Sequence, residues 1–397
     1  MRDKFYKNIG IDPEIFIKFR KIKADLYQKP EDFVVEEIFS GKLCDIRREN
    51  LGQHFNSSKR FIHATLVKRD ISTFDACKLL ASKNNFSVND IGYCGLKDTY
   101  GLTAQRISIL NRNKKQLKYT EFNNFFLKDF EGANENLKIR SHQGNHFIVK
   151  ARNILTPTQE CLILLNEFEN KMRQGFPNFY GPQRFGIRQN NHKLGRLLMK
   201  NEYHKFIFKF LTEINDNELP QIRKIRRKIK EKYGDWKKCL KIVENCRELS
   251  DEKELMLNLL KNNTVTSIRN VQISAFFIHA YISYIFNLTL SSYLKKEYRD
   301  VKIEKIGMTS KLNKLNRILY APILKKEKVN IKEIKSDCKK FAVKGHSRNS
   351  LFFPKNFSFE IKRNYIILKF NLEIGEYASL VLDFLFDNQM KAVEKLS

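Results

Sequence analysis

The chain has 397 residues, of which 74 are Lys or Arg and 44 are Asp or Glu, giving a formal net charge of +30. Its length suggests two or three domains, and 42% hydrophobic and 12% aromatic residues exclude global disorder. The charge far exceeds the roughly 2–8 that keep a small domain soluble. It therefore predicts a polyanionic partner, either nucleic acid or an anionic membrane surface.

Several protein classes are excluded. Residues 1–7 lack the apolar region of a secretory signal. The apolar stretch 271–290 predicts a buried amphipathic helix and not a membrane span, because it carries five polar side chains, Gln272, Ser274, His279, Ser283 and Asn287. Seven cysteines without a C-x-x-C pair argue against a disulfide framework or a zinc ribbon. We expect a reducing, cytoplasmic location.

Short strands dominate the first 155 residues. A helix is predicted over 72–84, with Ser72 or Thr73 as its N-cap. Strands are predicted at 30–38, 61–67, 91–94, 102–110 and 145–151.

Helices dominate the middle of the chain. A helix is predicted over 156–173, with Leu162, Leu165, Phe168 and Met172 on one face. Residues 195–350 consist of long Lys/Arg-rich helical patterns. Within them, residues 221–232 have seven basic side chains against one acidic one, and a stripe of isoleucines at 222, 225 and 229.

The end of the chain returns to strand-like sequence at 358–370, followed by a helix from Tyr377. This order predicts an α+β protein in which the two sheet-forming segments, 1–195 and 351–397, fold together. The basic, helical segment 196–350 is inserted between them.

No motif for a cofactor or metal is present. The sequence lacks G-x-G-x-x-G, G-x-x-x-x-G-K-[ST] and G-x-S-x-G. His142 and His146 are four residues apart, but the residues between them indicate a turn, so no metal site is expected there. We expect neither a metal nor a cofactor.

Two segments could carry chemistry. Asp98 lies in the glycine-flanked connection 95–101, where an aspartate is ordinarily a turn former. Such a loop on a sheet can also hold a catalytic carboxylate, and Lys97 and Arg106 supply positive charge nearby. The aromatic segment 176–186 is either a corner of the core or a floor for a flat base, with Asn178, Gln183 and Arg184 beside its edge.

These segments belong to a set of ordered blocks. The blocks are P-E-D-F-V-V-E-E at 30–37, G-L-K-D at 95–98 with T-A-Q at 103–105, G-N-H-F at 144–147, N-F-Y-G-P-Q-R-F-G at 178–186, S-A to A-Y-I-S-Y-I-F-N within 274–287, and G-E-Y-A-S at 375–379. Together they resemble the TruD family of tRNA pseudouridine synthases, in its larger archaeal and eukaryotic form.

The resemblance implies a mostly antiparallel sheet flanked by helices, forming a catalytic domain, with a mainly helical α/β TRUD domain inserted. It implies isomerisation of uridine to pseudouridine without cofactor or metal. Asp98 matches the nucleophile, Asn178 the residue that orients the carboxylate, and Tyr180 the ring that stacks on the extruded base. Where the family tends to carry a lysine three residues before the P-E-D-F block, this chain has Tyr27.

The partner implied is tRNA. We expect the protein to be a monomer. The resemblance suggests uridine 13 of tRNA, with position 35 of a tyrosine tRNA precursor as a further target. The side chains expected to contact RNA are Lys97, Gln105, Arg106, Gln183, Arg184, Arg223, Lys224, Arg226 and Arg227.

Two alternatives remain open from the sequence. The basic charge and the aromatic segment also fit a non-catalytic RNA-binding or RNA-folding protein on the same scaffold. A basic amphipathic helix could also lie on a membrane, although the isoleucine stripe is narrow.

Overall fold

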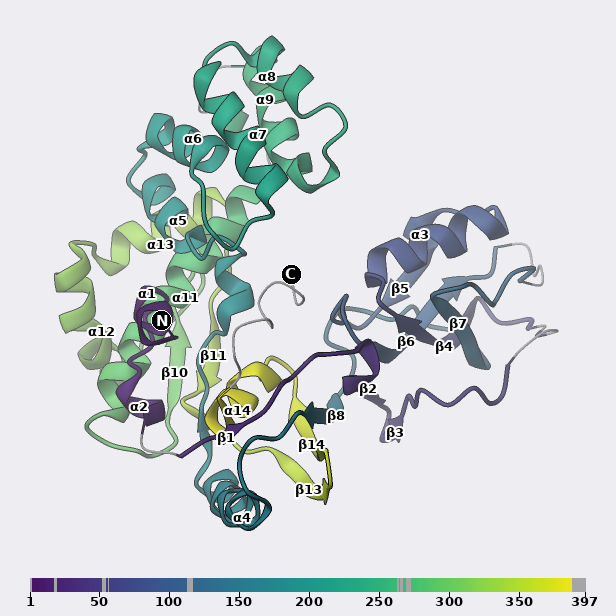
Figure 1. Cartoon of the computed structure of the whole chain (residues 1–397). Helices are drawn as coiled ribbons and strands as arrows, with labels where there is room; N and C mark the ends of the chain where they lie inside the picture. Colours follow the sequence, from purple (N-terminus) through teal and green to yellow (C-terminus); the bar gives the residue numbers. More distant parts are fainter. Residues whose placement is uncertain are drawn as a thin grey trace. The chain divides into compact units, whose positions relative to one another are not determined.

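The computed structural model describes residues 2–17, 20–51, 55, 57–112, 117–262, 264, 267–268 and 273–387. The chain divides into two compact units (Figure 1). The sheet unit comprises residues 19–176 and 353–397, and the helical unit comprises residues 1–18 and 177–352. These borders differ from the expected ones, because residues 1–18 and 177–195 belong with the middle segment.

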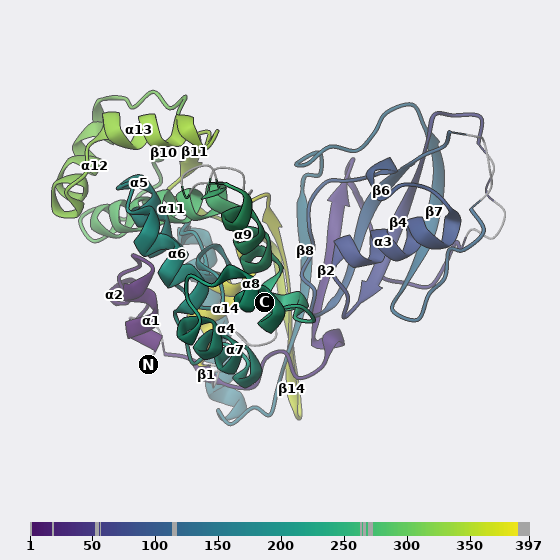
Figure 2. The same ribbon diagram turned by 90° about the horizontal axis from the view of Figure 1, so that it is seen from above.

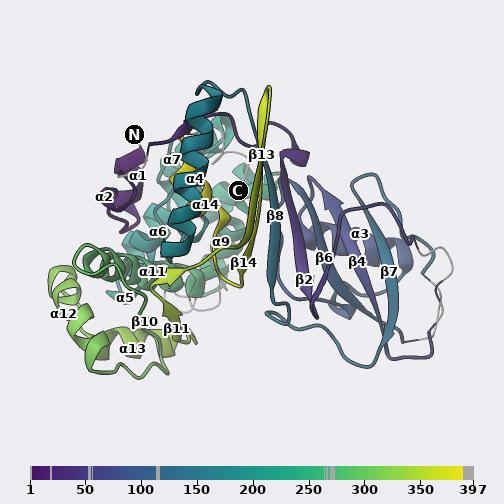
Figure 3. The same ribbon diagram turned by 90° about the horizontal axis from the view of Figure 1, so that it is seen from below.

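A nine-stranded sheet forms the sheet unit. Its main path runs β13-β14-β8-β2-β6-β4-β7, with β3 paired to β2 and β5 paired to β6 (Figure 3). Only β2 and β6 pair in parallel; the other pairs are antiparallel. The strands are β2 (Phe33–Phe39), β3 (Lys42–Leu43), β4 (Phe61–Arg69), β5 (Ile91–Tyr93), β6 (Leu102–Leu110), β7 (Phe125–Ala133), β8 (Gly144–Arg152), β13 (Lys355–Lys362) and β14 (Tyr365–Glu373).

The described residues of this unit also form three helices and a small strand pair. The helices are α3 (Thr73–Asn84), α4 (Thr158–Gln174) and α14 (Ala378–Leu385), with 3-10 turns at Pro30–Asp32 and Val88–Asp90. The strands β1 (Ile22–Lys23) and β15 (Phe386–Asp387) pair in parallel.

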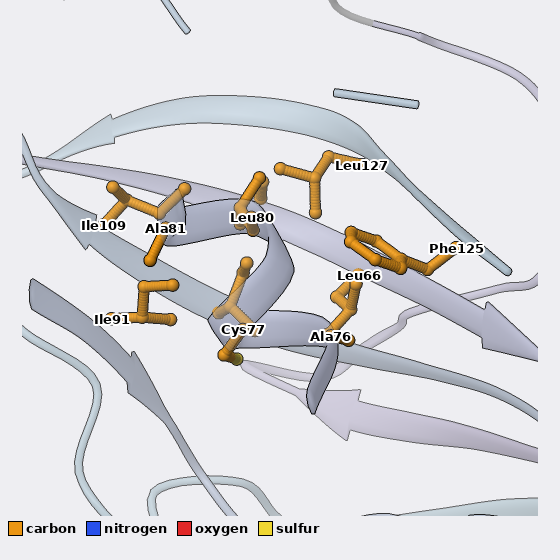
Figure 4. Close-up of a cluster of buried hydrophobic side chains, with 11 residues drawn as sticks. Leu66, Ala76, Cys77, Leu80, Ala81, Ile91, Ile109, Phe125 and Leu127 are labelled. Carbon is orange, nitrogen blue, oxygen red and sulfur yellow. The ribbon is translucent and has the colours of Figure 1, made fainter. Parts of the chain in front are cut away.

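Helix α3 covers one face of β4, β6 and β7 (Figure 2). Of the two N-cap residues predicted, Ser72 and Thr73, it is Ser72 that caps the helix, by accepting the amide hydrogen of Asp75. Its buried side chains meet those of the strands in a continuous apolar cluster (Figure 4), which includes Cys77, Leu80, Leu66 and Ile109. This packing fixes the start of α3 against the strands that flank residues 95–101.

The helical unit is built around α11 (Ile273–Leu294). The other elements are α1 (Arg2–Asn8), α2 (Glu14–Ile17), α5 (Asn191–Met199), α6 (Tyr203–Thr212), α7 (Pro220–Glu231), α8 (Trp236–Ile242), α9 (Ser250–Lys261), α12 (Lys314–Glu327), α13 (Ile331–Lys340), β10 (Lys302–Lys305), β11 (His346–Asn349), β12 (Leu351–Phe352) and 3-10 turns at Pro182–Phe185 and Arg247–Leu249. Strand β9 (Phe176–Pro177) lies where the two units join along the chain.

Helix α11 differs from the amphipathic helix expected. Its described side chains are buried on most of its circumference, and two of its hydroxyl groups bond within the helix. Ser283 and Thr289 donate to the carbonyls one turn earlier, at 2.8 and 2.9 Å. At Gly195 of α5, a Cβ would lie 2.0 Å from the carbonyl oxygen of Phe277, so α5 approaches α11 closely.

The predicted α+β class and mostly antiparallel sheet are confirmed. Strand β6 has the predicted bounds. The predicted face of α4 is wrong at Leu162, which is 47% exposed, because the buried side of α4 runs through Cys161, Leu164, Leu165 and Phe168. Strand β7 and the β10–β11 pair were not predicted.

Among the described residues, no helix has the length and apolar character needed to cross a membrane.

Candidate active site

Asp98 is half-buried in the loop between β5 and β6. Hydrogen bonds tie this loop to the two elements beside it. The Lys97 amide donates to Thr73 Oγ1 at 3.2 Å, Thr73 Oγ1 donates to Gln105 Oε1 at 2.8 Å, and Gln105 Nε2 donates to the Gly95 carbonyl at 2.9 Å. Thr73 and Gln105 are buried. The start of α3 and the middle of β6 therefore hold the loop in place.

The side chain of Lys97 points into the sheet unit. Its Nζ lies 2.6 Å from Glu37 Oε2, and neither side chain is more than 5% exposed. The other oxygen of Glu37 accepts the amide hydrogen of Arg106 at 3.0 Å. Burial, with the charge of Lys97 adding to it, lowers the pKa of His142 to about 4, so this imidazole is neutral at pH 7. Lys97 is thus an anchor of the loop.

Tyr27 lies near enough to Asp98 for the charge of that carboxylate to act on its phenol. It has a left-handed backbone conformation, with φ of 59°, and its carbonyl accepts from the Tyr100 hydroxyl at 2.9 Å. Burial raises the pKa of Tyr27, and the charges of Asp383 and Asp98 raise it further. The phenol therefore stays protonated at physiological pH. From the sequence, Thr73 was named only as a possible N-cap, and Tyr100 was given no role within the connection 95–101, because these tertiary hydrogen bonds leave no local pattern.

Asn178 and Tyr180 follow β9 in the helical unit. The Asn178 amide donates to the Ser350 carbonyl at 2.9 Å. Arg348 of β11 donates to Asn178 Oδ1, and to the carbonyls of Asn178 and Phe179 at 2.8 and 3.2 Å. The amide side chain of Asn178 is therefore held in one orientation by a charged donor.

Tyr180 is surrounded by cationic groups. Its ring centroid lies 4.6 Å from Arg348 Cζ, 4.9 Å from Lys305 Nζ and 5.8 Å from Arg184 Cζ. Its hydroxyl lies 2.8 Å from His346 Nε2. Cations over an aromatic face are attracted by its quadrupole. The aromatic rings of the segment are buried, as in a corner of the core. The cations around Tyr180 also supply positive charge of the kind that binds a phosphate backbone.

The predicted site residues thus fall into two groups. Asp98, with Lys97, Gln105 and Arg106, belongs to the sheet unit; Asn178, Tyr180, Gln183 and Arg184 belong to the helical unit. The expectation that Asp98, Asn178 and Tyr180 act at one site stays a prediction.

Two of the residues expected to contact RNA are buried structural groups of the sheet unit. Gln105 is 0% exposed and clamps the Asp98 loop. Arg106 is 8% exposed, and donates to the Asp129 carbonyl at 2.7 Å and to Glu131 Oε2 at 3.0 Å. Both side chains are used inside the fold, on opposite faces of the sheet: Gln105 bonds to Thr73 of α3, and the neighbouring Arg106 bonds to Glu131 of β7. The same correction applies to Lys97.

The arginines of helix α7 lie on different faces of the helix. Arg226 is 3% exposed and pairs with Glu218 and Glu252, each at 2.7 Å. Its guanidinium therefore braces α7 instead of contacting RNA. Lys224 and Arg227 are exposed, whereas Arg223 is half-buried and pairs with Asp216. The buried face runs through Ile222, Arg226 and Ile229, so Ile225 lies beside it.

The described residues contain no group of three or more His, Cys, Asp and Glu side chains that could hold a metal ion. His146 Nδ1 lies 2.6 Å from Asn371 Oδ1, which gives that ring a partner within the sheet.

Comparisons with known proteins place the chain. The family described as tRNA pseudouridine synthase D (TruD) matches residues 14–305. A probable tRNA pseudouridine synthase D 2 from Methanocaldococcus jannaschii is 27% identical over 95% of this chain and 96% of its own length. The tRNA pseudouridine synthase D of Aquifex aeolicus is 24% identical over 92% of this chain and 98% of its own.

The fold has a counterpart among solved structures. The crystal structure of a putative TruD protein from Methanosarcina mazei superimposes with a TM-score of 0.70, at 23% identity, covering 97% of this chain and 98% of that one. The sequence match over most of the chain and the shared fold agree, and the chain belongs to the TruD family of tRNA pseudouridine synthases.

Proposed function

We propose that this TruD-family protein isomerises a uridine of tRNA to pseudouridine, with the Asp98 carboxylate as its nucleophile. The observation that carries the proposal is the family match, which includes the G-L-K-D loop and extends over residues 14–305. The anchoring of that loop by Thr73 and Gln105 adds support, because a catalytic carboxylate needs a fixed position.

The reaction moves one glycosidic bond. The C1′–N1 bond breaks, the uracil turns, and a C1′–C5 bond forms while C5 loses a proton and N1 gains one. Asp98 assists either by attacking C1′ to give an ester or by taking a sugar proton to give a glycal, and both routes require an ionised carboxylate. The ammonium of Lys68, which donates to the Asp98 carbonyl at 2.6 Å, favours that form through its positive charge.

The target base must leave its stack, at a cost of a few kcal/mol. In this proposal Tyr180 stacks on the extruded base, and Asn178 orients the Asp98 carboxylate. The three cations around the Tyr180 ring support an RNA-binding role for this segment. Arg184 and Gln183, which lie beside it, then contact the neighbouring phosphates and base edges.

The exposed side of α7 is proposed as a second tRNA contact. Lys224 and Arg227 present their charges to solvent there, while Arg223 lies at its margin. Such side chains bind phosphates and release counterions. We further propose that the protein acts as a monomer in the cytoplasm, on uridine 13 of tRNA or on position 35 of a tyrosine tRNA precursor.

The test is release of tritium from tRNA labelled at C5 of uracil. We expect the wild-type protein to release tritium, and Asp98→Asn to lose at least about 1,000-fold in rate, because the amide cannot act as nucleophile or base. Asp25→Asn is the matched control: Asp25 is also half-buried in the sheet unit, and it accepts from Asn153 at 2.7 Å. We expect this control to retain the wild-type rate.

Release by Asp98→Asn at the wild-type rate would remove Asp98 from its role. Tight tRNA binding by the wild type without any tritium release would instead support the non-catalytic RNA-binding alternative. Binding to anionic vesicles in competition with tRNA would support the membrane-surface alternative.

A further inference from the structure

Lys68 is a buried lysine that reaches the Asp98 loop from the end of β4. It is 1% exposed. Its Nζ donates to the carbonyl oxygen of Asp98 at 2.6 Å and to that of Ile71 at 2.8 Å. The ammonium therefore joins the catalytic loop to the turn that precedes α3.

A buried ammonium at this place is costly. Desolvation disfavours the charged form, and both acceptors are main-chain carbonyls, which compensate a charge less well than a carboxylate does. An apolar side chain of similar length would fill the same space without this cost. The benefit must therefore come from the charge itself or from its hydrogen bonds.

The charged and ionisable groups around Lys68 indicate where that benefit lies. They are Asp98 and Asp70, which favour its ammonium form, Lys97, which opposes it, and the Cys77 thiol of α3. Asp98 is the strongest of the charges that act on Lys68. By reciprocity, the Lys68 ammonium favours the ionised form of Asp98 to the same extent.

We propose that Lys68 is a positioning residue for Asp98, holding the loop through the Asp98 carbonyl and keeping the nearby carboxylate ionised through its ammonium charge. This inference rests on the proposed function of Asp98. Lys68 itself does not touch the RNA, because its ammonium is enclosed within the sheet unit.

The arrangement has a consequence for pH dependence. Burial lowers the pKa of Lys68 to about 8. A lysine with a lowered pKa is charged below that value and loses its proton as the pH rises through it. We therefore expect the single-turnover rate of the wild type to fall above about pH 8, where the ammonium becomes neutral, and to fall at acidic pH, where Asp98 becomes protonated.

The test compares rate–pH profiles of Lys68→Met and Lys68→Arg under single-turnover conditions with saturating tRNA. We expect Lys68→Met to lose about 100-fold in rate through displacement of the loop. In this variant the rate should no longer fall at alkaline pH (the alkaline limb of the profile). The pH below which the rate falls (the acid limb) should rise by about one unit. In Lys68→Arg the guanidinium stays charged, so the acid limb should remain in place and the alkaline limb should move well above pH 8.

Lys128→Met is the matched control. Lys128 is a buried lysine on β7, 2% exposed, whose Nζ donates to the Arg47 carbonyl at 2.9 Å and to Asp45 at 2.5 Å. Its loss tests the general effect of removing a buried strand lysine from the sheet unit. We expect the control to keep both limbs of the profile in place.

Three results would overturn the inference: a Lys68→Met protein with both limbs unshifted, an equal shift in Lys128→Met, or an alkaline limb that stays near pH 8 in Lys68→Arg. The last comparison decides the matter if Lys68→Met does not fold, as judged by circular dichroism. A wild type that makes no pseudouridine would contradict the proposed function instead.

Discussion

Glu37 shows how a single carboxylate can hold the loop that carries Asp98 to its sheet. It is 0% exposed, pairs with Lys97 at 2.6 Å and accepts the amide hydrogen of Arg106 at 3.0 Å. Removal of one partner from a buried ion pair leaves an uncompensated charge, which costs several kcal/mol. The loop that carries Asp98 depends on this pair, because Lys97 immediately precedes Asp98.

We predict that Glu37→Gln lowers the free energy of unfolding by about 3 kcal/mol. Chemical denaturation measures this loss. The control is Glu131→Gln, which removes the carboxylate paired with Arg106; Glu131 is 73% exposed, so the expected loss is below about 1 kcal/mol. Equal losses in the two variants would contradict a special role for the Glu37–Lys97 pair.

At the residue scale, the sequence pointed to Asp98 through its glycine-flanked motif. It could not reveal the anchors, because Thr73, Lys68 and Gln105 reach the loop through tertiary hydrogen bonds. Gln105 was expected to contact RNA for the same reason: its polarity is visible in the sequence, but its burial follows from the pairing of β6 with β4 and β2.

The basic side chains of helix α7 lie on two faces, one buried and one exposed. Arg226 is enclosed by Glu218 and Glu252, whereas Lys224 and Arg227 are exposed. The sequence correctly predicted that this segment is a helix and that it is basic. It could not assign each arginine to a face, because the acidic partners of Arg226 lie on neighbouring segments 8 and 26 residues away.

We predict different effects for the two faces of α7. The double variant Lys224→Gln/Arg227→Gln should weaken tRNA binding and reduce the salt dependence, log Kd against log salt, by about 2, without loss of stability. Arg226→Gln should lower the free energy of unfolding by about 3 kcal/mol, because Glu218 and Glu252 lose their nearer partner and keep only Arg188, at 3.8 and 3.9 Å. Filter binding at several salt concentrations and denaturation measure these effects. A reduced salt dependence without loss of stability in Arg226→Gln would contradict the assignment of faces.

Among the elements, β6 and α3 were the best predicted, since local alternation and an N-cap define them. Strand β7 was missed. It contains Lys128, Asp129 and Gly132, and its pairing with β4 includes an irregularity between His63 and Thr65. Such a strand is stabilised by its partner more than by its own pattern.

Over the whole molecule, segments that are distant in sequence bind to one another within each unit. In the helical unit, Asn287 of α11 donates to the carbonyls of Ile9 and Tyr180, each at 3.0 Å, and accepts the Tyr180 amide hydrogen at 2.9 Å. One buried amide thus joins the N-terminal segment, the aromatic segment and the central helix. The borders expected from composition could not include residues 1–18 in this unit, because these contacts span up to 278 residues.

We predict that Asn287→Ala lowers the free energy of unfolding by about 3 kcal/mol, since it leaves buried main-chain groups of Tyr180 and Ile9 unsatisfied. Hydrogen exchange should also increase at residues 9–11 and 178–181. Thr289→Ala is the control, because Thr289 bonds only the carbonyl of its own helix at 2.9 Å. Increased exchange in the control at the same residues would contradict the proposed role of Asn287.

The most direct test of the central claim is nucleotide-resolution mapping of pseudouridine in a tRNA transcript incubated with the protein. We predict that the wild type converts one uridine, and that Asp98→Asn converts none while binding the same transcript with unchanged affinity. Formation of pseudouridine at that position by Asp98→Asn, at the wild-type rate, would contradict the account.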